Sequence, residues 1–412
     1  MKVTFGFVCS AVMGAALLAA TLLAPAALAA DAPKNSAKLA KPLKEAHDDL
    51  NAKKYSEAIA KLKEADGTAG KTPYDQHLIN DMLAFAYIRT NDYGDAEKAM
   101  EAEIDDGFTP PADQPQKVRA LAALNYQLKN YDKAIEFGQR AIKGGFAEGE
   151  TKTIVGQAYY LKGDWKNTLH FEEALVDAAI KSGATPSNES LQLVLSSCVK
   201  LDDGACTTKA LEKLVTYYPK PDYWYQLLYG LIKDTANSDT NTLQVFRLML
   251  DTDVLKSADD YIEMAQLAMD AGSPGEAQRV LQRGFEKNVF SDQRNKDKAQ
   301  RLLEKAKSKA ATDQPTLDKA AKEADAAPTG AKNSAMGVAY LGYGQYDKAV
   351  DQFTKAVSKG QLKNPAETQL DLGIAQLKAG HKDDAVKSFK AVKGDPVLER
   401  LGSLWALHAR EK

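Results

Sequence analysis

The stretch from Gly330 to Gly360 reads GAKNSAMGVAYLGYGQYDKAVDQFTKAVSKG, and it sets the interpretation of the whole chain. Apolar and small residues recur three and four positions apart on both sides of Gly344, first from Met336 to Tyr340 and then from Tyr346 to Ala356. This spacing predicts two short amphipathic helices joined by a tight turn. The small residues within each segment would let the two antiparallel helices approach closely.

The same pattern recurs along the chain. A small residue near the start of the second helix is found at Ala58, Ala96, Ala134, Ala210, Ala277, Ala349 and Ala385. The repeated pattern Met-Gly-x-x-Tyr, followed by Ala-x-x-x-Phe, resembles the tetratricopeptide repeat, with Asn333 where that repeat usually has Trp. The resemblance implies an all-α fold, an α-solenoid of about nine helix-turn-helix repeats closed by a C-terminal capping helix.

The repeat pattern, the N-terminal residues and the local composition together predict how the chain is divided. We expect a signal peptide over 1–29 and an N-terminal array of about seven repeats over 30–290. A degenerate helical hairpin over 291–329 and a C-terminal pair of repeats with the capping helix over 330–412 would follow. In the third repeat, Ala123 and Tyr126 match the repeat pattern, which predicts a turn one residue shorter than in the other copies.

The N-terminus has the features of a cleaved export signal. Lys2 supplies a positive charge, and an apolar run extends from Phe5 to Leu23. The segment Ala27-Leu28-Ala29 then offers the small residues that a signal peptidase requires. We expect an exported protein whose mature chain begins at Ala30 or Asp31 and which is located in the periplasm.

Two cysteines, Cys198 and Cys206, remain after that cleavage. In an exported protein such a pair is more often a disulfide than a catalytic pair, and the alternative is two buried small residues.

No sequence motif indicates catalysis. The chain has no phosphate-binding loop, no nucleophile elbow and no zinc-protease motif. His77 and Asp81 are four residues apart, as two metal ligands on one helix would be, but a third ligand is missing. The formal charge of -2 gives no reason to expect nucleic acid as a partner. We expect no enzyme, no cofactor and no metal.

An aromatic cluster lies between Tyr217 and Tyr229, with Tyr223, Trp224 and Tyr225 at its centre. Exposed aromatic side chains form binding surfaces, so this cluster could present a platform for a glycan or peptide. The alternative is packing between helices, which the position of Trp224 in the repeat favours.

A second candidate surface is the concave groove that the resemblance implies. In five copies, three positions of the first helix would face this groove, and ten of these fifteen residues are apolar or aromatic. These candidate partner-binding residues, here called the stripe, are Phe85, Ile88, Tyr160, Ile262, Met269, Val338, Leu341, Leu370, Ile374 and Leu377. Such a groove would take the apolar face of a partner helix or an extended apolar peptide. Packing of the stripe against neighbouring repeats remains equally open.

Two functions therefore remain from the sequence. The first is an exported interaction scaffold for other envelope proteins, similar to periplasmic repeat proteins that accompany TonB-type machines. The alternative is a binding module for a glycan or peptidoglycan fragment on the aromatic cluster.

Overall fold

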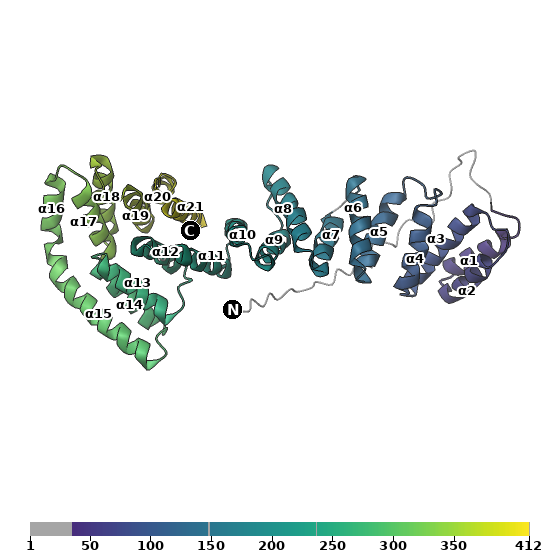
Figure 1. Cartoon of the computed structure of the whole chain (residues 1–412), viewed down its shortest axis with the longest axis horizontal. Helices are drawn as coiled ribbons and strands as arrows, with labels where there is room; N and C mark the ends of the chain where they lie inside the picture. The colour runs from purple at the N-terminus through teal and green to yellow at the C-terminus, as the bar shows by residue number, and fades with distance from the viewer. Residues whose placement is uncertain (1–34, 147–148, 236, 412) are drawn as a thin grey trace. The chain divides into compact units, whose positions relative to one another are not determined.

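The computed structural model describes residues 35–146, 149–235 and 237–411. In this part of the chain all regular secondary structure is helical (Figure 1). The residues form two compact units, which divide between Ala158 and Tyr159. The boundaries at 290 and 330 that the sequence suggests fall inside the second unit. The signal peptide over 1–29 lies outside the described residues, and no described helix is long and apolar enough to cross a membrane.

Unit 1 consists of successive helix pairs. Its helices are α1 (Ala40–Asn51), α2 (Tyr55–Asp66), α3 (Pro73–Arg89), α4 (Tyr93–Ile104), α5 (Gln114–Gln127), α6 (Tyr131–Lys143) and the first part of α7 (Gly149–Lys162). Each pair packs on the next through a continuous core that includes Leu43, Leu62, Ile79 and Leu121. This is the nearest-neighbour packing of a helical repeat array.

Unit 2 begins with the same kind of pairing. It contains the end of α7, then α8 (Trp165–Lys181), α9 (Asn188–Lys200), α10 (Gly204–Tyr217), α11 (Pro221–Asp234), α12 (Asp239–Asp251), α13 (Ala258–Asp270) and α14 (Pro274–Glu286). There follow α15 (Gln293–Asp313), the 3-10 turn η1 (Gln314–Thr316), α16 (Leu317–Ala326), α17 (Ala331–Gly342), α18 (Tyr346–Lys359), α19 (Pro365–Lys378), α20 (Lys382–Lys390) and α21 (Pro396–Glu411). The segment expected to be a degenerate hairpin is α15 and α16, joined at Pro315.

One turn geometry recurs between the paired helices. In each case a residue in the left-handed region, with φ between 54° and 87°, ends the first helix; these residues are Lys53, Asn91, Lys129, Gly163, Asp202, Gly272, Gly344 and Gly380. The next residue donates its amide to the carbonyl five positions earlier, as Asp92 does to Tyr87 at 2.8 Å and Gln345 to Tyr340 at 2.9 Å. This arrangement satisfies carbonyls left free at the helix end. The repeated hairpins confirm the all-α repeat fold predicted from the sequence.

The structure corrects the register of the third repeat. Ala122 and Asn125, rather than Ala123 and Tyr126, are fully buried between α5 and its neighbours. The Asn125 side chain donates to the Leu121 carbonyl at 3.0 Å, which satisfies a buried amide. Since Asn125 stands five residues before the amide of Asn130, the turn has the same length as the others. The predicted short turn was wrong because an aromatic residue happens to follow the buried asparagine.

Small residues act as the sequence predicts in α17 and α19. A Cβ added at Gly337 would lie 2.5 Å from the Phe353 ring, and one at Gly373 would lie 2.5 Å from the Phe389 ring. Both rings come from the second helix of the same pair and are almost completely buried. Any larger residue at either glycine would therefore push the paired helices apart.

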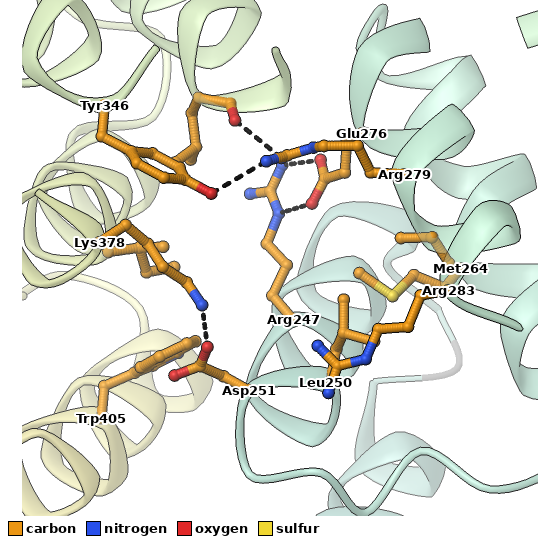
Figure 2. A pocket seen from close by; sticks show the side chains of 13 residues that line it. Arg247, Leu250, Asp251, Met264, Glu276, Arg279, Arg283, Tyr346, Lys378 and Trp405 are labelled. Atoms are coloured by element: carbon orange, nitrogen blue, oxygen red, sulfur yellow. Dashed lines mark hydrogen bonds and ion pairs between the residues drawn. The ribbon is translucent and has the colours of Figure 1, made fainter. Parts of the chain in front are cut away.

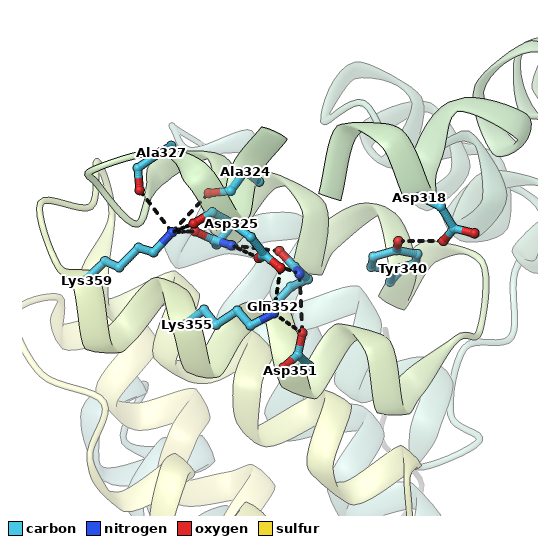
Figure 3. Close-up of polar contacts among 10 residues, drawn as sticks. Asp318, Ala324, Asp325, Ala327, Tyr340, Asp351, Gln352, Lys355 and Lys359 are labelled. Carbon is cyan, nitrogen blue, oxygen red and sulfur yellow. Dashed lines mark hydrogen bonds and ion pairs between the residues drawn. The ribbon is translucent and has the colours of Figure 1, made fainter. Parts of the chain in front are cut away.

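A polar cluster fixes α16 on the pair α17 and α18 (Figure 3). Lys359 donates to the carbonyls of Ala324, Asp325 and Ala327 at 2.9–3.0 Å, and so caps the C-terminus of α16. Asn333 is fully buried and donates to the carboxylate of Asp325 at 2.9 Å. This contact gives a structural role to the residue that replaces the usual Trp of the repeat.

The last helices of unit 2 return to its middle. α21 packs on α20, as a capping helix does, and it also contacts α12. Figure 1 shows α19 and α21 beside α12. Side chains more than a hundred residues apart meet here, including Gln244 with Asp371 at 2.8 Å and Asp251 with His408 at 3.0 Å. The C-terminal helix therefore joins two parts of the unit as well as covering its end.

Candidate binding sites

In unit 1 the stripe is partly accessible. Phe85 and Ile88 are half-buried on α3. The Phe85 ring packs edge-on against Tyr55 with 6.2 Å between centroids, and the guanidinium of Arg89 lies 5.0 Å from the same ring. These two residues thus form an apolar surface of α3 that is not closed off from solvent.

In unit 2 the stripe is mostly covered. Its buried members are Ile262, Met269, Leu341, Leu370 and Ile374, none of which is more than 5% exposed. Its half-buried members are Tyr160, Val338 and Leu377. The Tyr160 hydroxyl lies 2.8 Å from the Ser196 hydroxyl, and its ring packs against Trp165. Within this unit the protein's own side chains occupy most of the surface that the sequence offers to a partner.

The aromatic cluster is also largely interior. Tyr223 and Trp224 are buried on α11, and Trp224 packs against His408 of α21 with 6.0 Å between ring centroids. Tyr225 is half-buried and stacks on Tyr229, which is exposed. Of the residues from Tyr223 to Tyr229, the cluster therefore presents only the Tyr225 and Tyr229 rings to solvent, while Tyr217 and Tyr218 are half-buried.

The two cysteines meet between α9 and α10. The structure places their sulfur atoms at disulfide distance, with the Cα atoms of Cys198 and Cys206 5.4 Å apart. That Cα separation is usual for a disulfide. The bond would join the end of α9 to the first turn of α10.

His77 and Asp81 do not share a ligand site. His77 Nδ1 lies 2.9 Å from Asp106, while Asp81 accepts from Lys117 at 2.7 Å. Lys117 also contacts the buried carboxylate of Glu103, and burial raises the pKa of Glu103 to about 7. Among the described residues no group of three or more histidines, cysteines or carboxylates could hold a metal ion.

Unit 2 contains a cavity of about 240 Å³ that the sequence did not reveal. Figure 2 shows Tyr346, Lys378 and Trp405 on one side of it and Met264, Arg279 and Arg283 on the other. Its remaining walls are Arg247, Leu250, Asp251, Glu276, Val280, Leu341 and Ile374. Since these residues come from α12, α13, α14, α17, α18, α19 and α21, the return of the C-terminal helices creates the cavity.

A buried ion network forms one wall. Arg247 donates two hydrogen bonds to Glu276, at 2.8 and 2.7 Å, and a third to Asp371 at 2.9 Å. Burial alone would lower the pKa of Arg247, but the two carboxylates raise it, so the guanidinium stays charged. Burial raises the pKa of Asp371 despite this cation. The network links α12, α14 and α19. All three of these hydrogen bonds from Arg247 go to carboxylates of the protein itself.

The other three cationic side chains of the cavity have fewer carboxylate partners than Arg247. Lys378 is paired with Asp251. Arg283 pairs with Asp253 at 2.7 Å, but Lys287 binds the same carboxylate. Arg279 donates to two uncharged oxygens, the Tyr346 hydroxyl at 3.0 Å and the Leu341 carbonyl at 2.9 Å.

Sequence reasoning missed these residues because the groups that meet are far apart in the chain. Arg279 and Tyr346 are 67 positions apart, and Arg247 and Asp371 are 124 apart. The only local signal is the four-residue spacing of Arg279 and Arg283, which places both on one face of α14.

Comparisons with known proteins give a consistent but weak picture. No protein-family model and no curated protein matches the chain. Similar solved structures include the TPR2AB domain of yeast Sti1 in a complex with pHSP90, with 16% identity over 73% of this chain and 99% of that one and a TM-score of 0.25. A tetratricopeptide repeat protein from Parabacteroides merdae has 12% identity over 80% and 98% of the two chains and a TM-score of 0.29.

A third structure is the C-terminal part of a TPR repeat-containing protein from Cytophaga hutchinsonii. It shows 14% identity over 62% of this chain and 98% of that chain, with a TM-score of 0.33. TM-scores this low show no common arrangement of the whole chains. The evidence for the type of repeat therefore comes from the helical hairpins of this chain. Their recurrent turn and their buried small residues show an all-helical array of repeated helical hairpins, which resemble tetratricopeptide repeats.

Proposed function

We propose that the protein is an exported, non-catalytic scaffold that binds a segment of another envelope protein on unit 1. The observation that supports this is the contrast between the two units. Phe85 of unit 1 is half-buried, while Ile374, at the matching position of unit 2, is buried by the protein itself. The stripe is thus a surface that can pack against apolar side chains. In unit 1, part of this surface is still accessible to solvent and so to a partner.

The expected ligand is an amphipathic helix or an extended apolar segment. In unit 2, the buried stripe residues Leu341 and Ile374 come from neighbouring helices, α17 and α19, which pack against each other. A partner segment with apolar residues on one face would make equivalent contacts in unit 1. Arg89, whose guanidinium lies over the Phe85 ring, would favour a segment with acidic residues beside its apolar face.

The test of partner binding is a pair of matched substitutions. Ile88→Ser in unit 1 is expected to abolish photo-crosslinking of a partner at neighbouring positions of α3 and to lower the free energy of unfolding by only about 1 kcal/mol, because the side chain is half-buried. Val357→Ser is the control, because Val357 is a branched apolar residue that is 40% exposed on α18 in the other unit. Crosslinks that persist in the Ile88 variant, or that disappear in both variants, would contradict the proposal. A large loss of stability for Ile88→Ser would show that the residue belongs to the core instead.

Export is tested together with the disulfide. The protein purified from cells without reductant should have an intact mass that lacks the first 29 or 30 residues, as the Ala27-Leu28-Ala29 site predicts. Its mass should fall short of the reduced mature chain by two hydrogen atoms, because disulfides persist in oxidising compartments. A full-length mass would refute export. Two free thiols in the unfolded, unreduced protein would refute the bond between Cys198 and Cys206.

A further inference from the structure

The helix α15 of unit 2 exposes a row of basic side chains. Five exposed residues lie along one face of this helix and are here called the basic row: Arg294, Lys298, Arg301, Lys305 and Lys309. At 3.6 residues per turn they fall within about 80° of the helix circumference and extend over about 22 Å. Among the described residues, none of the five side chains has a hydrogen-bond or ion-pair partner. The row therefore presents positive charge that the fold itself does not neutralise.

The carboxylates within α15 are held by residues outside the basic row. Asp297 accepts a hydrogen bond from Gln293 at 2.7 Å. Glu304 accepts from Gln300 and from Lys307, both at 3.1 Å. Because Asp297 and Glu304 lie on a neighbouring face of the helix, they leave the face of the basic row without a negative charge.

Neighbouring helices also leave the row unpaired. α15 packs against α13 and α14. The charge of Lys298 lowers the pKa of Glu263 on α13, although burial and nearby aspartates raise that pKa overall, and the two side chains form no ion pair. Asp313, at the end of α15, accepts from the Tyr343 hydroxyl at 2.7 Å. A carboxylate partner for the row must therefore come from outside the described part of the chain.

A pair of helices in the same unit shows the kind of surface that matches such a row. Lys348 and Lys355 are seven residues apart on α18, and they bind Asp318 and Asp325, which are seven residues apart on α16, at 2.9 and 2.7 Å. Figure 3 shows part of this contact. The seven-residue spacing of the two lysines also occurs twice within the basic row. An acidic helix can therefore pair with cations arranged in this way.

The composition of α15 argues against a membrane surface as the partner. Large apolar side chains that are exposed in the described part of the chain, such as Tyr229 and Val357, lie on other helices. A helix that lies in a membrane interface carries aromatic or aliphatic residues on the face opposite its cations. The large apolar residues of α15, Leu302 and Leu303, are instead buried against the rest of unit 2.

We propose that the basic row of α15 binds an acidic helix of a partner protein, whose carboxylates are three, four or seven residues apart along one face. Charge pairs of this kind fix the register and the choice of partner more than they add affinity. Since the row is exposed, its attraction should weaken as the salt concentration rises. The surface lies on unit 2 and does not depend on the apolar surface proposed for unit 1.

The test uses two synthetic alanine-rich helical peptides of the same composition and the length of α15. One carries its glutamates in a single row with the spacing of the basic row, and the other carries the same glutamates spread around the helix. Fluorescence anisotropy at low salt should show that the first peptide binds at least about threefold more tightly, because only its carboxylates can pair with the row together. Equal affinity for two peptides of equal helicity would refute the proposal, because binding would then depend on net charge alone.

Substitutions assign the binding to α15. Arg301→Gln combined with Lys305→Gln should weaken binding of the first peptide at least about threefold, since two of the ion pairs are lost. Lys319→Gln combined with Lys322→Gln is the matched control, because these lysines are exposed on α16 and their loss changes the net charge equally. An equal loss of affinity in both double variants, or no loss in either, would show that the basic row is not the binding surface.

A competition experiment distinguishes an acidic helix from other anionic partners. Polyphosphate and vesicles of phosphatidylglycerol and phosphatidylcholine in equal parts are titrated against the complex with the first peptide. Both are expected to displace the peptide weakly, at higher concentrations of negative charge than the unlabelled peptide requires. Displacement at lower concentrations by polyphosphate or by the vesicles would overturn the proposal, because the row would then select phosphate groups over a helix of carboxylates.

Discussion

Replacing Arg247 by Leu is expected to lower the free energy of unfolding of unit 2 by about 3–5 kcal/mol. The substitution would leave Glu276 and Asp371 buried without their shared cation, and a carboxylate buried in this way must become protonated or draw in water. Tryptophan fluorescence measures this unit selectively, because Trp165, Trp224 and Trp405 all lie within it. The measurement is a denaturant titration followed by this fluorescence.

A second variant distinguishes loss of the cation from loss of packing. Replacing Arg247, Glu276 and Asp371 together by Leu should recover part of the stability, since a buried ion network can often be exchanged for apolar residues of similar volume. Arg294→Leu, on the exposed face of α15, is the control and should have little effect. If the triple variant is less stable than the single variant, the three side chains stabilise unit 2 mainly by their packing and not by their charges.

The second large expected effect on the free energy of unfolding comes from replacing a buried leucine of α19. Leu370→Ala is expected to cost about 2–5 kcal/mol, because Leu370 is fully buried on α19. Leu377→Ala, seven residues later on the same helix, should cost about 1 kcal/mol or less, because that side chain is half-buried. Both variants are compared in the same fluorescence-detected unfolding experiment.

The outcome decides what the stripe of unit 2 does. A large difference between the two leucines would show that Leu370 belongs to the core and is unavailable to a partner. Equal and small losses would mean that α19 detaches readily, so that its apolar face could bind another protein. The second result would contradict the packing described for unit 2.

The repeat fold could be predicted because its determinants are local. The spacing of Met336, Gly337 and Tyr340 around the turn at Gly344 lies within one hairpin, and the structure places these residues where the pattern requires. The register error in the third repeat shows the limit of such patterns. Tyr126 looks like a repeat residue, whereas the buried position belongs to Asn125, which a hydrophobic pattern does not select.

The candidate sites could be predicted less well, because exposure depends on contacts between distant segments. Phe85 and Ile374 hold the same position in the local pattern, yet Phe85 is half-buried and Ile374 is almost completely buried. The difference arises because α19 and α21 return to α12, and nothing in the spacing of apolar residues specifies that return. The cavity and its arginines could not be predicted for the same reason.

The return of the last helix also determines when unit 2 can be completed. Asp251 and His408 are 157 residues apart, and their contact needs a helix that ends at Glu411. A helical array held by neighbouring contacts can assemble pair by pair as the chain is synthesised. Here the face of α12 that contacts α19 and α21 stays uncovered until the final helix has emerged. We therefore expect this unit to mature after synthesis ends, and a chain that stops before α21 to depend on chaperones.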